Sequence, residues 1–254
     1  MDNRNTKLLI FLSLLIILVT GLSFTPRSAI YKGENVAVVE LFTSEGCSSC
    51  PAADEMLKEM TDIMAKENKP VVGLAYHITY WDHLGWKDPY SQEKFTDRQK
   101  KYCGLLQVPS IYTPQMVVDG EFEFVGSDPI SFRRRVEEVL TTSAPYQLDA
   151  RATIQDNEIS VAYSLNKKPK HEVMNIALIE IFVKNSVQRG ENKNKTLQHY
   201  NVVRKLETAD LLPTGEFKMT MPADLDPSNC AVVLFIQHQR NLSVLGAQKI
   251  SLSR

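Results

Sequence analysis

Residues 37–54 read AVVELFTSEGCSSCPAAD and combine a strand, a cysteine pair and the start of a helix. The β-branched and apolar run over 37–43 predicts a buried strand, and the apolar residues of 53–66 recur at helical spacing. Cys47 and Cys50 lie between the two, where free backbone amides and the helix dipole stabilise a thiolate. We therefore expect Cys47 to be a nucleophile and Cys50 the thiol that resolves its disulfides.

The segments that follow alternate between strand and helix. We expect a strand over 71–77, a helix over 92–106, short strands over 116–119 and 121–125 around an Asp119-Gly120 turn, and a helix ending at Leu140 that Ser127-Asp128-Pro129 caps. The order strand, helix, strand, helix, hairpin, helix predicts an α/β thioredoxin-like domain over residues 31–145.

Thr113 and Pro114 directly precede the predicted hairpin. They resemble the Thr/Val–cis-Pro pair of thioredoxin-like proteins, in which the proline lies against the cysteine motif and the preceding residue pairs with an extended substrate. We therefore predict a cis peptide bond before Pro114, which is rare enough to be a specific prediction. Glu40 has two interpretations: a buried acid that moves a proton to or from the resolving thiol, or an exposed acid at a strand edge.

Residues 77–89 (HITYWDHLGWKDP) follow the second predicted strand and contain both tryptophans. His77 ends that strand at the same sheet edge as Cys47, so we take it as a candidate acid, base or substrate contact. Polar and large aromatic groups so close together suggest the wall of a site, with Tyr80, Trp81 and Asp82 contacting substrate. The alternative is that the tryptophans fill the core and the acids cap the loop.

Long motifs also make the chain similar to a bacterial secreted family labelled domain of unknown function 1223. They occupy 40–54, 77–89, 112–120, 189–204 and 244–247. The resemblance covers about residues 36–250 and implies a thioredoxin-like fold with a β-rich C-terminal domain. It implies no activity.

Residues 146–254 change to alternating apolar and polar positions. Seven strands are expected there, over 148–154, 158–165, 174–183, 199–205, 215–221, 231–237 and 244–252. This pattern predicts an antiparallel β-sandwich-like domain. The long polar loop at 185–196 contains Arg189-Gly190-Glu191-Asn192, which we expect to fold back toward Arg204 or against the first domain.

The N-terminus has the pattern of a targeting segment. Arg4 and Lys7 precede the apolar run Leu8–Val19, which is typical of a secretory signal peptide and is short for an uncleaved anchor. Residues 1–30 are thus expected to be a signal peptide or an N-terminal anchor. Either one predicts an extracytoplasmic protein, with membrane contact only through this segment.

Charge and cysteine content exclude two classes of protein. The formal net charge is −1, which gives no support for nucleic-acid binding. Four cysteines in 254 residues are too few for a disulfide scaffold. Cys103 and Cys230 are expected to be buried thiols, although Cys103 has an alternative as a third redox partner.

Two functions follow from these residues. The first is an extracytoplasmic thiol–disulfide oxidoreductase that acts on protein or small-molecule thiols and disulfides without a cofactor. The second is a non-enzymatic binding module, in which Cys47 and Cys50 form a structural disulfide or bind a metal with His77 or Cys103. The sequence leaves open the substrate, the direction of electron flow and the role of the C-terminal part.

Overall fold

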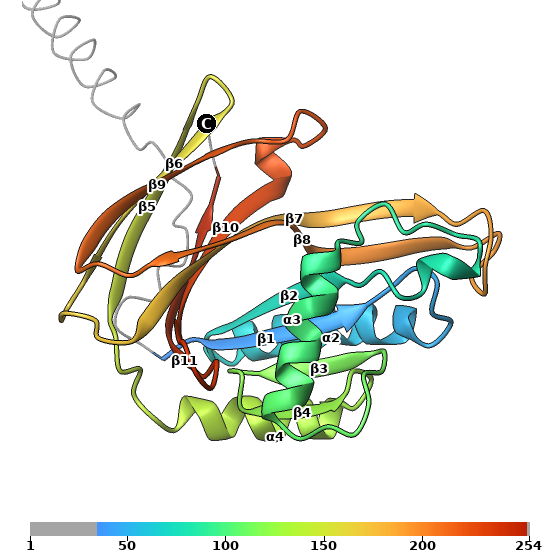
Figure 1. The fold of residues 1–254 in the computed structure, drawn as a ribbon, viewed down its shortest axis with the longest axis horizontal. Helices are drawn as coiled ribbons and strands as arrows, with labels where there is room; N and C mark the ends of the chain where they lie inside the picture. Colours follow the sequence, from blue (N-terminus) through green and yellow to red (C-terminus); the bar gives the residue numbers. More distant parts are fainter. Residues whose placement is uncertain (1–34, 253–254) are drawn as a thin grey trace, which may run out of the picture.

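The computed structural model describes residues 35–252 of the chain. It has an eight-stranded mixed sheet in the order β11-β10-β7-β8-β2-β1-β3-β4 and a three-stranded antiparallel sheet in the order β5-β6-β9 (Figure 1). Up to residue 140 the elements are β1 (Ala37–Thr43), α2 (Cys50–Lys66), β2 (Val71–His77), α3 (Glu93–Leu105), β3 (Gln115–Val118), β4 (Phe122–Val125) and α4 (Pro129–Leu140). Beyond it they are β5 (Leu148–Gln155), β6 (Glu158–Leu165), β7 (Glu172–Ser186), β8 (Thr196–Asp210), β9 (Thr214–Thr220), β10 (Cys230–His238) and β11 (Val244–Ser251).

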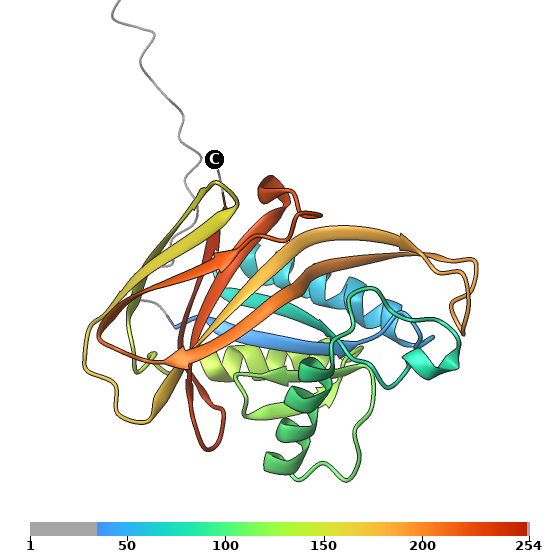
Figure 2. The same ribbon diagram turned by 45° about the horizontal axis from the view of Figure 1, so that its top comes forward.

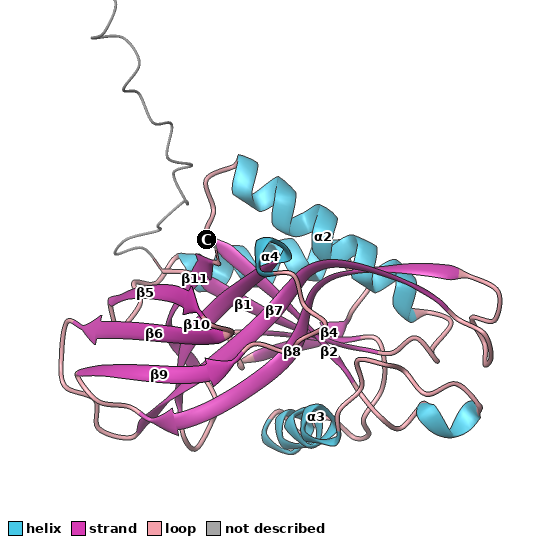
Figure 3. Ribbon diagram, turned by 90° about the horizontal axis from the view of Figure 1, so that it is seen from above, coloured by secondary structure: helices cyan, strands magenta, loops and turns pink. Residues whose placement is uncertain are grey.

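β1 lies inside the large sheet, between β2 and β3, and all seven of its residues are buried. Val39 and Leu41 point to the face that α2 and α4 cover, whereas Val38 and Phe42 point to the face that α3 covers. Figure 3 shows these helices on opposite sides of the sheet. A strand covered on both faces carries apolar residues at successive positions, which explains why this run is continuous rather than alternating.

The predicted elements before residue 145 are present, with small shifts at their ends. α2 begins at Cys50 itself, and Pro51 occupies its first turn, where a missing N–H costs nothing. Asp128 caps α4 by accepting hydrogen bonds from the backbone amides of Ile130 and Ser131. Asp119 and Gly120 form the turn between β3 and β4, both with positive φ.

The strands beyond residue 145 are antiparallel as predicted, but most of them extend the first sheet. β8 pairs with β2 in parallel where Ala75 faces Val202, so β7, β8, β10 and β11 continue the sheet of β1–β4. Only β5, β6 and β9 form a separate layer, which packs on the outer part of the large sheet and encloses a second core (Figure 2). The expected sandwich therefore shares one of its two layers with the α/β part.

Cys103 and Cys230 are both buried, as predicted, and burial raises the pKa of the Cys230 thiol to about 12. At the surface, Arg133 of α4 pairs with Glu67 and Glu137. The predicted signal peptide or anchor lies outside the described residues, and within 35–252 no helix combines the length and apolarity needed to span a membrane.

Candidate functional site

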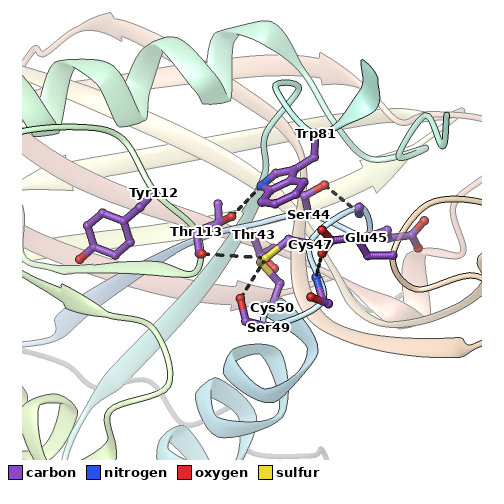
Figure 4. Close-up of a disulfide and its surroundings, with 12 residues drawn as sticks. Thr43, Ser44, Glu45, Cys47, Ser49, Cys50, Trp81, Tyr112 and Thr113 are labelled. Atoms are coloured by element: carbon purple, nitrogen blue, oxygen red, sulfur yellow. Dashed lines mark hydrogen bonds between the residues drawn. A yellow bond between two sulfur atoms is a disulfide. The ribbon is translucent and has the colours of Figure 1, made fainter. Parts of the chain in front are cut away.

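Cys47 and Cys50 form a disulfide at the N-terminus of α2, with their Cα atoms 5.4 Å apart. The peptide bond between Thr113 and Pro114 is cis, as predicted. The Thr113 carbonyl oxygen lies 3.9 Å from Cys47 Sγ, and Ser49 Oγ lies 3.3 Å from the same sulfur (Figure 4). The structure therefore brings the cysteine pair and the cis-proline segment together.

The cysteine pair is covered. Cys47 is 1% exposed and Cys50 is fully buried. Trp81 Nε1 donates a hydrogen bond of 2.7 Å to Thr113 Oγ1, so the indole braces the residue beside the sulfur. A Cβ atom on Gly46 would lie 2.9 Å from Trp81 Cβ, and this close contact accounts for glycine in the turn before Cys47.

Tyr80 and Asp82, the other two loop residues predicted to contact substrate, have mainly structural contacts. Tyr80 is half-buried and packs against the core of the large sheet. Asp82 accepts hydrogen bonds from the Ser91 hydroxyl and the Asp88 amide, which gives it a role in holding its loop. Among the three predicted wall residues, Trp81 donates the hydrogen bond to the cis-proline segment.

The turn between β7 and β8, residues 187–195, lies over the cysteine motif. Asn192 Nδ2 donates hydrogen bonds of 2.9 Å to the carbonyl oxygens of both Glu45 and Cys47. Glu191 Oε2 accepts a hydrogen bond of 2.9 Å from the Ser48 amide. Of the two predicted positions for this loop, the one against the first domain holds, since Arg204 pairs instead with Glu180 and Asp224. We call residues 187–195 the cover turn.

Replacement of Asn192 by alanine is expected to make the disulfide roughly tenfold easier to reach. The change leaves the buried Glu45 carbonyl without a donor and the Cys47 carbonyl with only the Cys50 amide. The cost of about 1–3 kcal/mol weakens the closed position of the cover turn. The rate at which dithiothreitol reduces the Cys47–Cys50 bond, followed by alkylation and mass spectrometry, measures the effect. Gln188→Ala is the matched control, because Gln188 is exposed on the same turn and, within residues 35–252, donates to the Ser186 carbonyl alone. Equal reduction rates for Asn192→Ala and the wild type would contradict the prediction.

Beneath the motif lies a cluster of buried charges that the sequence analysis missed. His199 of β8 sits between two carboxylates: its Nε2 is 3.2 Å from Glu45 Oε1 and its Nδ1 is 3.4 Å from Asp54 Oδ2. Glu45 also accepts a hydrogen bond of 2.7 Å from Trp86 Nε1. The signal that could have found Glu45 and Asp54 is their position, since they flank the two cysteines in the sequence.

The cluster carries a positive charge between two negative ones. Burial lowers the pKa of His199, but its contacts with Asp54 and Glu45 outweigh burial and raise that pKa to about 10. The imidazole is therefore protonated at neutral pH. This cation offsets the cost of placing two carboxylates out of water.

His77 lies next to this cluster, on the side of β2. Its Nδ1 is 2.7 Å from Asp88 Oδ2, and its ring meets that of His199 edge to face, with centroids 4.8 Å apart. Asp88 also accepts a hydrogen bond of 2.8 Å from the Glu45 amide. His77 thus lies near the predicted sheet edge, and its closest carboxylate is that of Asp88. Among the described residues, His77 makes no contact with either cysteine sulfur.

Glu40 is buried, yet it faces away from the disulfide. Its side chain shares the face of Val38 and Phe42, opposite the face that α2 covers. Arg98 donates a hydrogen bond of 2.8 Å to Glu40 Oε1, and Tyr102 donates to the same oxygen. We therefore assign Glu40 a structural role and leave it out of the chemistry proposed below.

A metal site at the cysteines finds no support. Among residues 35–252, no three His, Cys, Asp or Glu side chains are grouped so that they could hold a metal ion. The two candidate third ligands have other neighbours, with His77 beside Asp88 and Cys103 beside Gln115.

Comparison with known proteins identifies the family. A family model described as a protein of unknown function (DUF1223) matches residues 38–237, from β1 into β10. The chain belongs to the DUF1223 family. The matched range includes the cysteine motif, the cis-proline segment and the cover turn of this DUF1223 protein.

Solved structures show a relative of the same fold. Protein AGR_C_4864 from Agrobacterium tumefaciens is 24% identical, with a TM-score of 0.64, and the match covers 87% of the DUF1223 chain and 96% of that chain. A domain of the outer membrane lipoprotein Omp28 from Porphyromonas gingivalis is 14% identical, with a TM-score of 0.29, over 43% of this chain and 89% of that one. The second similarity is too low to carry an argument. No significant match was found among curated proteins.

Proposed function

We propose that this DUF1223 protein is an extracytoplasmic thiol–disulfide oxidoreductase built on a thioredoxin-like domain. The observation that carries the proposal is the pairing of Cys47 and Cys50 at the start of α2 with the carbonyl of Thr113, before cis-Pro114. A helix N-terminus lowers the pKa of a thiol, and a low pKa makes the thiol both a nucleophile and a leaving group.

In the proposed reaction, a substrate thiolate attacks Cys47 Sγ and the Cys47–Cys50 bond breaks. Cys50 leaves with the electron pair, and the substrate sulfur is joined to Cys47 in a mixed disulfide. A second substrate thiolate then displaces Cys47, so the substrate is oxidised to a disulfide and the cysteine pair is reduced by two electrons. The reverse sequence reduces a substrate disulfide. The extracytoplasmic location fits a pair that must persist as a disulfide for part of the cycle.

The burial of the cysteines favours a second candidate, a binding module with a structural disulfide. With Cys47 only 1% exposed, a substrate reaches the sulfur only after neighbouring residues move. A structural disulfide needs no such opening, and it resists exchange with the glutathione pool.

Replacement of Cys50 by serine separates the two candidates. If the pair exchanges, Cys47 attacks a substrate disulfide and the mixed disulfide accumulates, because no resolving thiol is present. We expect covalent partners in non-reducing gels from the native host, and a glutathione adduct on Cys47 after treatment with oxidised glutathione. The double variant Cys47→Ser, Cys50→Ser is the control and should trap nothing.

Failure to trap any partner, together with a wild-type pair that does not equilibrate with glutathione buffers, would contradict the oxidoreductase. In that case the structural disulfide is the better account of Cys47 and Cys50.

A further inference from the structure

Asp54 has a buried oxygen with nothing to bind. The residue is 2% exposed, and its Oδ1 has no hydrogen-bond partner within the part of the chain that the structure describes. Its other oxygen, Oδ2, accepts a hydrogen bond of 3.2 Å from Thr43 Oγ1 and lies 3.4 Å from His199 Nδ1. A buried acceptor without a donor is costly, so this atom calls for an explanation.

The position of Asp54 on α2 supplies one. Asp54 comes four residues after Cys50, and both are buried on the helix. Residues four apart lie on one face, and helical side chains lean toward the N-terminus, so the Asp54 side chain extends back over the turn that begins with Cys50. In the disulfide Cys50 has no hydrogen to donate. Once the pair is reduced, the Cys50 thiol is a donor.

His199 holds the Asp54 side chain in position. Its Nδ1 lies 3.4 Å from Asp54 Oδ2, the oxygen that also accepts from Thr43, and this leaves Oδ1 as the unpaired atom. On its other side His199 contacts Glu45, and its ring also meets the rings of His77 and Tyr90. Asp54 comes from α2 and His199 from β8. The charged and titratable groups around these two residues are Glu45 before α2, His77 of β2, and Asp88 and Tyr90 of the loop after β2.

We propose that Asp54 exchanges a proton with Cys50 during thiol–disulfide exchange, and that His199 is the positioning residue that holds Asp54 through its Oδ2. The inference rests on the oxidoreductase proposed above. When a mixed disulfide on Cys47 is resolved, the Cys50 thiol gives its proton to Asp54. The Cys50 thiolate attacks Cys47 Sγ, the bond from Cys47 to the substrate sulfur breaks, and the substrate leaves as a thiolate with the electron pair. In the opposite direction Cys50 leaves as a thiolate and takes the proton back.

The C-terminal part of the chain then has a catalytic purpose. β8 supplies His199, and the cover turn next to β8 holds the backbone of Glu45 and Cys47. The continuous sheet is what places this strand beside α2, so the proposed site is incomplete without the residues after 145.

Asp54→Asn tests the proposal, since asparagine has the same shape but does not take up the proton. Reduced protein is mixed with oxidised glutathione, quenched with acid at short times, and analysed by mass spectrometry for the Cys47–glutathione adduct and for the closed disulfide. We expect closure by Cys50 to slow by on the order of 100-fold at pH 7, so that the adduct accumulates. The difference in closure rate between the wild type and Asp54→Asn should shrink toward pH 9, where hydroxide ionises the Cys50 thiol directly.

Two further variants separate the proton transfer from a structural effect. His199→Gln should slow closure by Cys50 without slowing formation of the Cys47 adduct, because Asp54 loses the contact at its Oδ2. A packing role alone would not separate the two steps. Asp119→Asn is the matched control: it replaces another buried carboxylate of the same sheet, whose contact is the Val38 amide, and should leave closure unchanged.

The outcomes are distinguishable from failure of the proposed function. If wild-type protein forms no adduct and no closed disulfide, the oxidoreductase itself is wrong. If the adduct forms and Asp54→Asn closes it at the wild-type rate and pH dependence, with an unchanged near-UV circular dichroism spectrum, the oxidoreductase stands and the role of Asp54 is overturned.

Discussion

Replacement of Arg98 by methionine is expected to lower the free energy of unfolding by about 3–5 kcal/mol, because it leaves a buried carboxylate without its cation. The Glu40 side chain is 1% exposed and that of Arg98 is 10% exposed. Arg98 also donates a hydrogen bond of 2.9 Å to Gln237 Oε1. The ion pair therefore ties α3 to β1 and, through Gln237, to β10. Urea denaturation followed by circular dichroism measures the loss.

Two comparisons make this prediction specific. Arg133→Met removes a surface arginine that pairs with Glu67, and exposed pairs are worth only about 0–1 kcal/mol. The double variant Glu40→Leu, Arg98→Met should recover much of the loss, since no uncompensated charge is left in the core. If Arg98→Met costs no more than Arg133→Met, the buried pair does not hold the two parts of the sheet together.

The stability of the protein is expected to fall as pH rises from neutral to about 10, through the deprotonation of His199. Its folded pKa, about 10, lies above the value of an unfolded histidine, about 6.5. Folding therefore favours the protonated form. The resulting stabilisation is complete below about pH 6.5 and is lost as pH rises through the folded pKa. The full contribution is on the order of 5 kcal/mol.

The pH dependence is measured as a difference between wild type and His199→Gln in urea denaturation from pH 6 to pH 10. The wild type should be more stable at pH 6, and the two should converge near pH 10. Asp119 also titrates in this range, because burial raises its pKa to about 8. When folding raises the pKa of an acid, the protein loses stability as pH rises from the unfolded pKa to the folded one. Asp119→Asn should therefore flatten the curve of stability against pH below pH 8 and leave the change above pH 8. A constant gap between wild type and His199→Gln would contradict the role of His199.

Local patterns account for the parts of the site that were predicted. The apolar run of β1 leads directly into Cys47, and Cys50 opens α2, because strand, turn and helix signals follow one another within 37–54. The cis bond before Pro114 was predicted from the resemblance of Thr113-Pro114 to the Thr/Val–cis-Pro pair of thioredoxin-like proteins, and it is present. The strand, the turn and the helix depend on residues close together in the sequence, whose preferences are strong enough to be read one segment at a time.

Glu40 and the cover turn show where that approach becomes ambiguous. A single acid in an apolar strand fits a buried proton carrier or an exposed edge position equally well. The structure instead pairs the buried Glu40 with Arg98 of α3, a partner that only the fold brings near. The sequence predicted a long polar loop at 185–196, but the hydrogen bonds from Asn192 to the Glu45 and Cys47 carbonyls depend on where β7 and β8 join the sheet.

The sequence by itself determined that this protein has a cysteine pair at a strand-to-helix junction, a cis-proline segment to face it, and antiparallel strands after residue 145. Only the tertiary structure decided that those strands continue the first sheet and bring His199 between Glu45 and Asp54. The physical reason is that alternation along a strand reports which face is buried but not which strand lies beside it. Buried charges are stable only beside a partner, and here the partner comes from a distant part of the chain.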